Sequence, residues 1–153
     1  MAHKKTIPKT IRNSRASFDY DIKDEYVAGI VLTGAETKSL RMGRGSLRGA
    51  YVTFKDGAPW LLNAHISALQ TNAVHLDESV QTRTRKLLLK GREVDELLQA
   101  HDMGSSIIPI KLLTQGRYIK IVVGVGKGKK HYDKRQTLKK RDNDLEARRA
   151  MQS

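Results

Sequence analysis

The sequence predicts a mostly β domain whose antiparallel strands form a closed or nearly closed barrel. Two strand-like runs flank the dipeptide Asp56-Gly57, which is a strong signal for a two-residue hairpin. A second hairpin is expected to turn at Gln115-Gly116. Five or six short strands fit a chain of 153 residues, a length typical of one domain.

Three segments carry the predicted strands: residues 18–32, 47–66 and 106–126. The first two are rich in β-branched and aromatic residues, which favour extended structure. In the third, every second residue from Ile119 to Val125 is apolar, so one face of that strand is expected to be buried. Pro109 cannot donate a backbone hydrogen bond and therefore predicts an edge or a bulge.

Two short amphipathic helices are expected to cap the barrel. In residues 33–43, Thr33 and Glu36 have the spacing of a capping box, and Gly43 can end the helix. In residues 91–104, the apolar residues recur at helical spacing and a glycine again stands at the end.

The net charge of +13 is concentrated near the two ends of the chain. Residues 1–17 carry five basic residues and no acid, and residues 127–153 carry ten basic residues against four acids. We therefore expect a basic N-terminal arm (1–16), a barrel (17–126) and a flexible basic C-terminal tail (127–153). Such arms bind polyanions by releasing counterions, which favours nucleic acid as the partner. The alternative is that both arms are solvated tails that only increase solubility. Binding to a membrane surface is not expected, because neither arm has the wide apolar face that would insert into the lipid.

Catalytic and metal chemistry are not expected. The chain has no cysteine, its five histidines lack ligand spacing, and no acid cluster falls in a predicted loop. The stretch "GVGKGKK" lacks the Ser or Thr and the long helix of a phosphate-binding loop. We expect no cofactor, no metal and no membrane span, and a cytoplasmic location. The basic N-terminus has no secretory h-region, although a mitochondrial presequence remains compatible with its composition.

A β-barrel with an inserted helix and basic loops is the arrangement of an oligonucleotide-binding fold. Three blocks, "AGIVLTGAETKSLRMG", "RTRKLLLKGREVDELL" and "VGVGKGKKHYDKR", resemble in order and spacing the signature blocks of the small protein B family. The resemblance covers about residues 9–150. It implies an oligonucleotide-binding-fold-like antiparallel barrel with short helices and a disordered basic C-terminal tail.

The resemblance also implies a function. Members of this family are RNA-binding factors and not enzymes. They bind the transfer-RNA-like domain of transfer-messenger RNA, expected here as a monomer in a 1:1 complex. They deliver that RNA to stalled ribosomes, where the tail enters the decoding region and messenger channel of the small subunit. This process is trans-translation, and it tags the nascent peptide. A general single-strand RNA chaperone or a ribosome-associated RNA-binding protein is the alternative.

The resemblance, together with the positions of the basic residues, gives candidate residues for both partners. Those expected to bind RNA are Asn13, Lys38, Arg41, Arg83, Arg85, Lys86, Leu88, Lys127, Lys129 and Lys130. Those expected in the ribosome-binding tail are Tyr132, Asp133, Lys134 and Arg135. Cations suit the phosphates of a structured RNA, and a tyrosine ring can stack on an exposed base. An ordinary solvated loop around residue 85, and a packing role for Leu88, are the alternatives.

The chain departs from the family pattern at one position. Where the family usually has aromatic-Glu-Ala-Gly, this sequence has "YVAG", so Val27 replaces an acid associated with RNA binding. A valine side chain cannot accept a hydrogen bond. Glu25 is expected to face the same side of a regular strand, so either Glu25 substitutes for the acid or the RNA partner differs at that contact.

Overall fold

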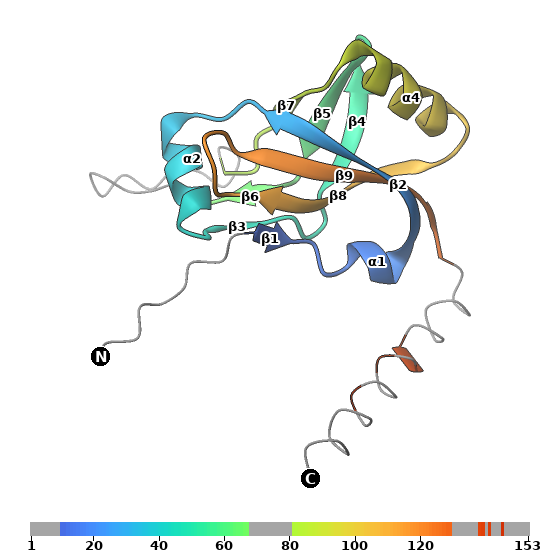
Figure 1. Cartoon of the computed structure of the whole chain (residues 1–153), viewed down its shortest axis with the longest axis horizontal. Coiled ribbons are helices and arrows are strands. Elements are labelled where there is room, and N and C mark those ends of the chain that lie inside the picture. Colours follow the sequence, from blue (N-terminus) through green and yellow to red (C-terminus); the bar gives the residue numbers. More distant parts are fainter. Residues whose placement is uncertain (1–9, 68–80, 130–137, 140, 142–144, 146–153) are drawn as a thin grey trace.

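The protein is an open, strongly curved antiparallel sheet with helices at its ends (Figure 1). The structure, a computed structural model, describes residues 10–67 and 81–129, together with residues 138, 139, 141 and 145. The elements are β1 (Thr10–Arg12), α1 (Ala16–Asp19), β2 (Tyr20–Ile30), α2 (Gly34–Arg41), β3 (Gly45–Ser46), β4 (Tyr51–Lys55), β5 (Ala58–Leu62), β6 (His65–Ile66), β7 (Arg85–Leu88), α4 (Gly91–Asp102), β8 (Ser106–Leu113) and β9 (Lys120–Gly128).

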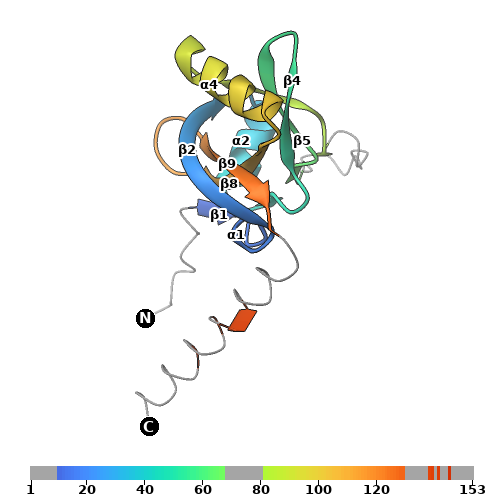
Figure 2. The same ribbon diagram turned by 90° about the vertical axis from the view of Figure 1, so that its right-hand side faces the viewer.

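Seven strands form the main sheet in the order β1-β8-β9-β2-β7-β5-β4, and β3 pairs separately with β6. The sheet curls so that its edge strand β4 approaches β8 without pairing with it. Figure 2 shows this curl in the turned view. The predicted class, a mostly β, oligonucleotide-binding-fold-like domain, is therefore confirmed, with the barrel left unclosed between these strands.

The predicted hairpin turn and the predicted irregularity at Pro109 are both present in the structure. Asp56 and Gly57 join β4 to β5 with φ values of 53° and 75°, and a two-residue hairpin turn of this kind needs positive φ at both positions. The β8–β9 register shifts between Pro109 and Lys111, which confirms a bulge at this proline. Because β8 lies between β1 and β9, it is the bulge and not an edge that accommodates Pro109.

The core fills the concave side of the sheet and is capped by α2 and α4. Ile119, Ile121 and Val123 are buried as the alternation predicts, and Val125 packs against the same cluster. Leu40 of α2 and Leu97 of α4 are completely buried against the sheet. Apolar side chains from distant strands thus share one core, which fixes the outward direction of the intervening residues.

The ordered body extends beyond the predicted barrel at both ends. β1 lies within the segment expected to be an arm: it pairs with β8, and Ile11 joins the core. The short helix α1 was not predicted. At the other end, β9 continues to Gly128, and the amide of Lys129 donates to the carbonyl of Asp19 at 2.8 Å. Across the described ranges, every helix is too short or too polar to cross a membrane.

The capping box of α2 leads to a stability prediction. The Thr33 side chain accepts from the Glu36 amide, and the Glu36 carboxylate accepts from the Thr33 amide at 2.9 Å. We expect Thr33→Ala to lower the free energy of unfolding by about 1 kcal/mol, because one helix-terminal N–H loses its acceptor. Urea unfolding followed by circular dichroism measures this, with the exposed Lys38→Ala as the control on the same helix. Equal stability of Thr33→Ala and wild type would contradict it.

Candidate nucleic-acid interface

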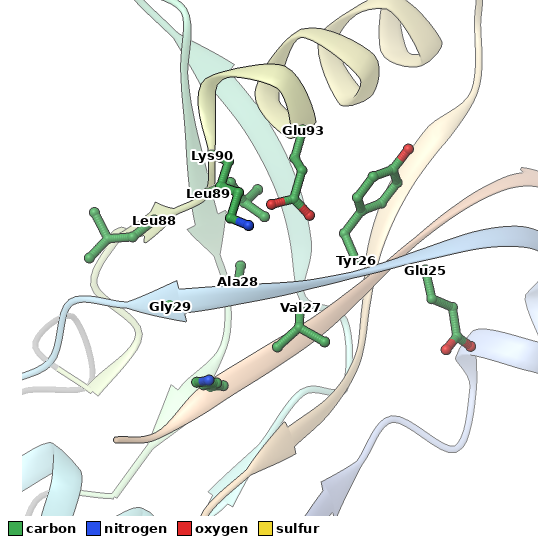
Figure 3. Close-up of a pocket in the computed structure, with 10 residues that line it drawn as sticks. Glu25, Tyr26, Val27, Ala28, Gly29, Leu88, Leu89, Lys90 and Glu93 are labelled. Atoms are coloured by element: carbon green, nitrogen blue, oxygen red, sulfur yellow. The ribbon is translucent and has the colours of Figure 1, made fainter. Parts of the chain in front are cut away.

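A groove opens where β7 separates from β2. β7 pairs with β2 only at Gly29 and Ile30, and after Leu88 the chain turns away towards α4. The groove has a volume of about 630 Å³. Its lining residues are Glu25, Tyr26, Val27, Ala28, Gly29, Leu88, Leu89, Lys90, Glu93 and Lys120 (Figure 3). It therefore combines strand, helix and loop residues that lie far apart in the sequence.

Two lysines lie on the outer side of the sheet beside this groove. Lys120 of β9 is opposite Gly29, and Lys86 lies on β7 two residues before Leu88. Both lysine side chains are exposed. Ammonium groups spaced along a sheet face can contact successive phosphates of an RNA backbone.

Apolar side chains are exposed between these charges. Leu88 is 54% exposed and Val27 is 51% exposed, whereas the neighbouring Leu87 is almost fully buried. Gly29 lies beneath Leu88, and a Cβ on Gly29 would stand 3.3 Å from the Leu88 Cβ. Of the two alternatives for Leu88, contact with RNA or packing in the core, this exposure favours contact with a partner.

Arg85 is buried, whereas the predicted contact with an RNA phosphate would require an exposed side chain. Its guanidinium Nε donates to Glu36 at 2.6 Å, and its terminal nitrogens donate to the carbonyls of Ala64, Arg83 and Gln81 at 2.8, 3.0 and 2.8 Å. The side chain is 0% exposed. Every accepting group is intramolecular, so Arg85 holds the 81–85 loop against α2 and is not free to contact a phosphate. We remove it from the proposed interface.

Glu36 is the centre of this charged cluster. Burial would raise the pKa of its carboxyl group, but hydrogen bonds from Arg83, the Thr33 amide and Arg85 outweigh burial and hold that pKa below its usual value. Arg83 also pairs with Glu36, and its side chain is 34% exposed. Arg83 can therefore still present part of its charge outward, whereas the side chain of Lys86 on β7 is exposed.

Arg41 and Asn13 also have structural partners. Arg41 donates to the carbonyls of Gly116 at 2.8 Å and Arg117 at 3.2 Å, so it fastens the β8–β9 turn to α2. The side-chain Nδ2 of Asn13 donates to the carbonyl of Pro109 at 2.9 Å, and its side-chain oxygen accepts from the backbone N–H of Arg15. Lys38, one turn before Arg41, remains exposed.

The predicted tail residues are only partly described. Lys127 is exposed on β9, opposite Asp21 of β2, and the Lys129 backbone is tied to α1. Lys130, Tyr132, Asp133, Lys134 and Arg135 lie outside the described residues. Further along, the Arg141 guanidinium lies 5.9 Å from the Phe18 ring centroid of α1.

The sequence reasoning missed Lys120 and Lys90 as candidate RNA contacts. Lys120 stands between Ile119 and Ile121, both of which were expected to be buried, so strand alternation alone could have placed it on the outer face. Lys90 immediately precedes α4 and lines the groove only because β7 leaves the sheet at that point. No local pattern indicates that departure.

One side of the groove is bordered by a fixed hydroxyl group. The Tyr26 hydroxyl donates to Glu96 at 2.8 Å, and this bond, with burial and nearby carboxylates, raises the pKa of Tyr26 to about 12. Tyr26 thus stays neutral at physiological pH. Glu25 and Val27 point to the opposite side of β2 from Tyr26, which agrees with the expected alternation (Figure 3).

Comparisons with known proteins identify the family. The family model described as "SmpB protein" matches residues 10–153. The chain belongs to the SmpB family. An SsrA-binding protein of Synechocystis sp. is 39% identical over 153 residues, covering 99% of each chain. The SsrA-binding protein of Streptococcus uberis is 42% identical over 144 residues, covering 93% of this chain and 91% of the relative.

A solved structure shows the same fold. It is described as "tmRNA-SmpB: a journey to the center of the bacterial ribosome", and its matching chain is 35% identical with a TM-score of 0.66. The match covers 81% of this chain and 87% of the other. Membership of the SmpB family therefore rests on sequence along nearly the whole chain and on the curved sheet that carries the groove.

Proposed function

We propose that this protein binds transfer-messenger RNA through its transfer-RNA-like domain and delivers it to stalled ribosomes for trans-translation and peptide tagging. Membership of the SmpB family, whose similar members are named SsrA-binding proteins, supports this role. The observation that carries it is the exposed face around the groove, where lysines flank Val27 and Leu88. A structured RNA presents phosphates and unstacked bases, which suit those two kinds of side chain.

The proposed interface differs from the set expected from the sequence. It keeps Lys86 and Leu88, with a partial contribution from Arg83, and adds Lys120 and Lys90. Lys38, Lys127, Lys129 and Lys130 remain proposed phosphate contacts. Asn13 and Arg41 are proposed to act by holding their loops in place, since their side chains already bond within the fold.

The remaining parts of the proposal follow from this role. The protein acts as a binding factor without catalysis, in the cytoplasm, as a monomer with one RNA. Tyr132, Asp133, Lys134 and Arg135 are proposed to contact the decoding region and messenger channel of the small subunit. The segment 127–153 is strongly basic, which favours contact with the negatively charged RNA of the ribosome.

A gel-shift comparison tests the proposed partner. We expect the full chain to bind transfer-messenger RNA at least tenfold more tightly than an unstructured RNA of equal length at the same salt concentration, because a dedicated factor recognises RNA shape. Equal affinity for both RNAs would instead support the general RNA chaperone.

A double variant tests the groove-side lysines. We expect Lys86→Ala with Lys120→Ala to weaken binding and to reduce the slope of log affinity against log salt by up to roughly 1.8, at about 0.9 per duplex-like phosphate contact. Lys23→Ala with Lys55→Ala removes the same charge from exposed positions that do not line the groove. If both double variants lose affinity equally, the groove face is not the specific contact surface.

A further inference from the structure

Helix α2 is bonded to three segments that lie far apart in the sequence. Glu36, in its first turn, accepts from Arg85 at the start of β7. The buried Ser39 hydroxyl donates to the carbonyl of Ser67, and Arg41 in the last turn donates to the β8–β9 turn. Figure 1 shows this turn beside α2. One short helix therefore connects segments that the sequence separates.

Two of these segments lead directly into strands that carry exposed lysines. Arg85 is followed by Lys86 on β7, and the β8–β9 turn is followed by Lys120, the first residue of β9. β2 lies between β9 and β7 and continues into α2 through residues 31–33. The helix thus lies at one end of three adjacent strands, and the two lysines flank the middle strand near that end.

Arg41 attaches the β8–β9 turn to α2 at three points. Its terminal guanidinium nitrogens donate to the carbonyls of Thr114 at 3.3 Å, Gly116 at 2.8 Å and Arg117 at 3.2 Å. A guanidinium is planar, and its donors point in fixed directions. Bonds to three neighbouring carbonyls therefore fix both the position and the orientation of the turn on the helix.

Lys120 lies where the β8–β9 ladder meets this turn. The last pair of the ladder is Leu113–Lys120, and residues 115–118 of the turn are exposed. The ends of a ladder open more readily than its centre, so the attachment of the turn also limits the motion of Lys120. A charged group that is already held in place loses less conformational freedom when it binds a phosphate.

We propose that Arg41 is a positioning residue for RNA binding, which holds the β8–β9 turn on α2 and thereby keeps Lys120 in place to contact a phosphate. Arg41 acts through Lys120 and does not touch the RNA itself. The inference rests on the proposed function, because it requires RNA at this face of the protein. It adds to that function the particular charge that depends on the attached turn.

A double-mutant cycle in the affinity for transfer-messenger RNA tests this proposal. We expect Arg41→Ala to weaken binding about fivefold in the wild-type chain, but less than about 1.5-fold when Lys120→Ala is already present, because both changes affect the same contact. The slope of log affinity against log salt is expected to fall by up to roughly 0.9 in Lys120→Ala and no further in the double variant. A direct phosphate contact by Arg41 would instead make the two losses multiply and lower the slope by up to roughly 1.8.

Two further variants are the controls. Lys38 is exposed one turn before Arg41 and is proposed to contact a phosphate directly, so the losses from Lys38→Ala and Lys120→Ala should multiply. Arg41→Lys keeps the positive charge but lacks the planar fork, so we expect it to bind as weakly as Arg41→Ala. Thermal unfolding checks that each variant is folded, and Arg41→Lys completes the cycle if Arg41→Ala does not fold.

Three outcomes overturn the proposal. They are wild-type affinity in Arg41→Lys, equal weakening by the Arg41 substitution with and without Lys120, and unchanged affinity in Lys120→Ala, which would leave Arg41 no contact to act through. Failure of the proposed function shows differently, as equal affinity of wild type for transfer-messenger RNA and unstructured RNA.

Discussion

Arg85→Ala is expected to lower the free energy of unfolding by about 3–5 kcal/mol, the usual cost of breaking a buried ion pair by removing one partner. The substitution leaves the Glu36 carboxylate with Arg83 and the Thr33 amide, and it removes the donors to three carbonyl groups. It also empties the space of a fully buried side chain. Because small domains are stable by only about 5–15 kcal/mol, this loss is a large fraction of the total.

Urea unfolding followed by circular dichroism measures the effect, and Arg83→Ala is the matched control. Arg83 is partly exposed, and its removal leaves the fully buried Arg85 partner of Glu36 in place, so we expect a loss of about 1 kcal/mol or less. If Arg85→Ala costs no more than Arg83→Ala, the buried cluster does not stabilise the fold in the way that its geometry indicates.

The cluster of Glu36, Arg83 and Arg85 makes the free energy of unfolding depend on pH. The folded-state pKa of Glu36 lies below its unfolded value of about 4.3, so its contribution to stability is fully present above that value. It is lost as the pH falls through the folded-state pKa. We expect the stability difference between wild type and Glu36→Gln to shrink over that acidic range.

Replacement of Asp133, Lys134 and Arg135 by alanine is expected to abolish peptide tagging on stalled ribosomes while leaving the affinity for transfer-messenger RNA within about threefold of wild type. The physical reason is that the body and the tail are proposed to contact different partners. The groove face is built by β2, β7, β9 and α4, all of which end by Gly128. The three replaced residues come after that face and are proposed to contact only the ribosome. A change of threefold corresponds to about 0.6 kcal/mol.

A reconstituted translation reaction on a messenger without a stop codon measures tagging, and a gel shift measures RNA binding. The matched control is Lys139→Ala with Arg141→Ala, which removes two positive charges further along the tail. A chain that stops after Lys130 serves as the extreme variant, with thermal unfolding expected to stay within a few degrees of wild type. Full-rate tagging by the triple variant, or unfolding of the body in the shortened chain, would contradict the assignment.

Much of the local architecture could be predicted from the sequence, because the interactions concerned span only a few residues. The Thr33–Glu36 capping box, the Asp56-Gly57 turn and the bulge at Pro109 each depend on backbone geometry and neighbouring groups. The groove was only partly predictable. Leu88 was named, but its exposure was left open, and Lys120 and Glu93 were not recognised as its neighbours.

The sequence by itself determined the capping box, the Asp56-Gly57 turn, the bulge at Pro109 and, through its signature blocks, the family. The tertiary structure alone decided which cation of the segment 82–86 is buried and which faces outward. In "RTRK", Arg85 and Lys86 have the same charge and adjacent positions, yet Arg85 turns inward with Leu87 while Lys86 turns outward with Leu88. That choice depends on the pairing of β7 with β2 and β5, and on Glu36 being held by a distant helix where it can neutralise a buried guanidinium. A buried charge is stable only beside such a partner, and the partner is brought there by folding.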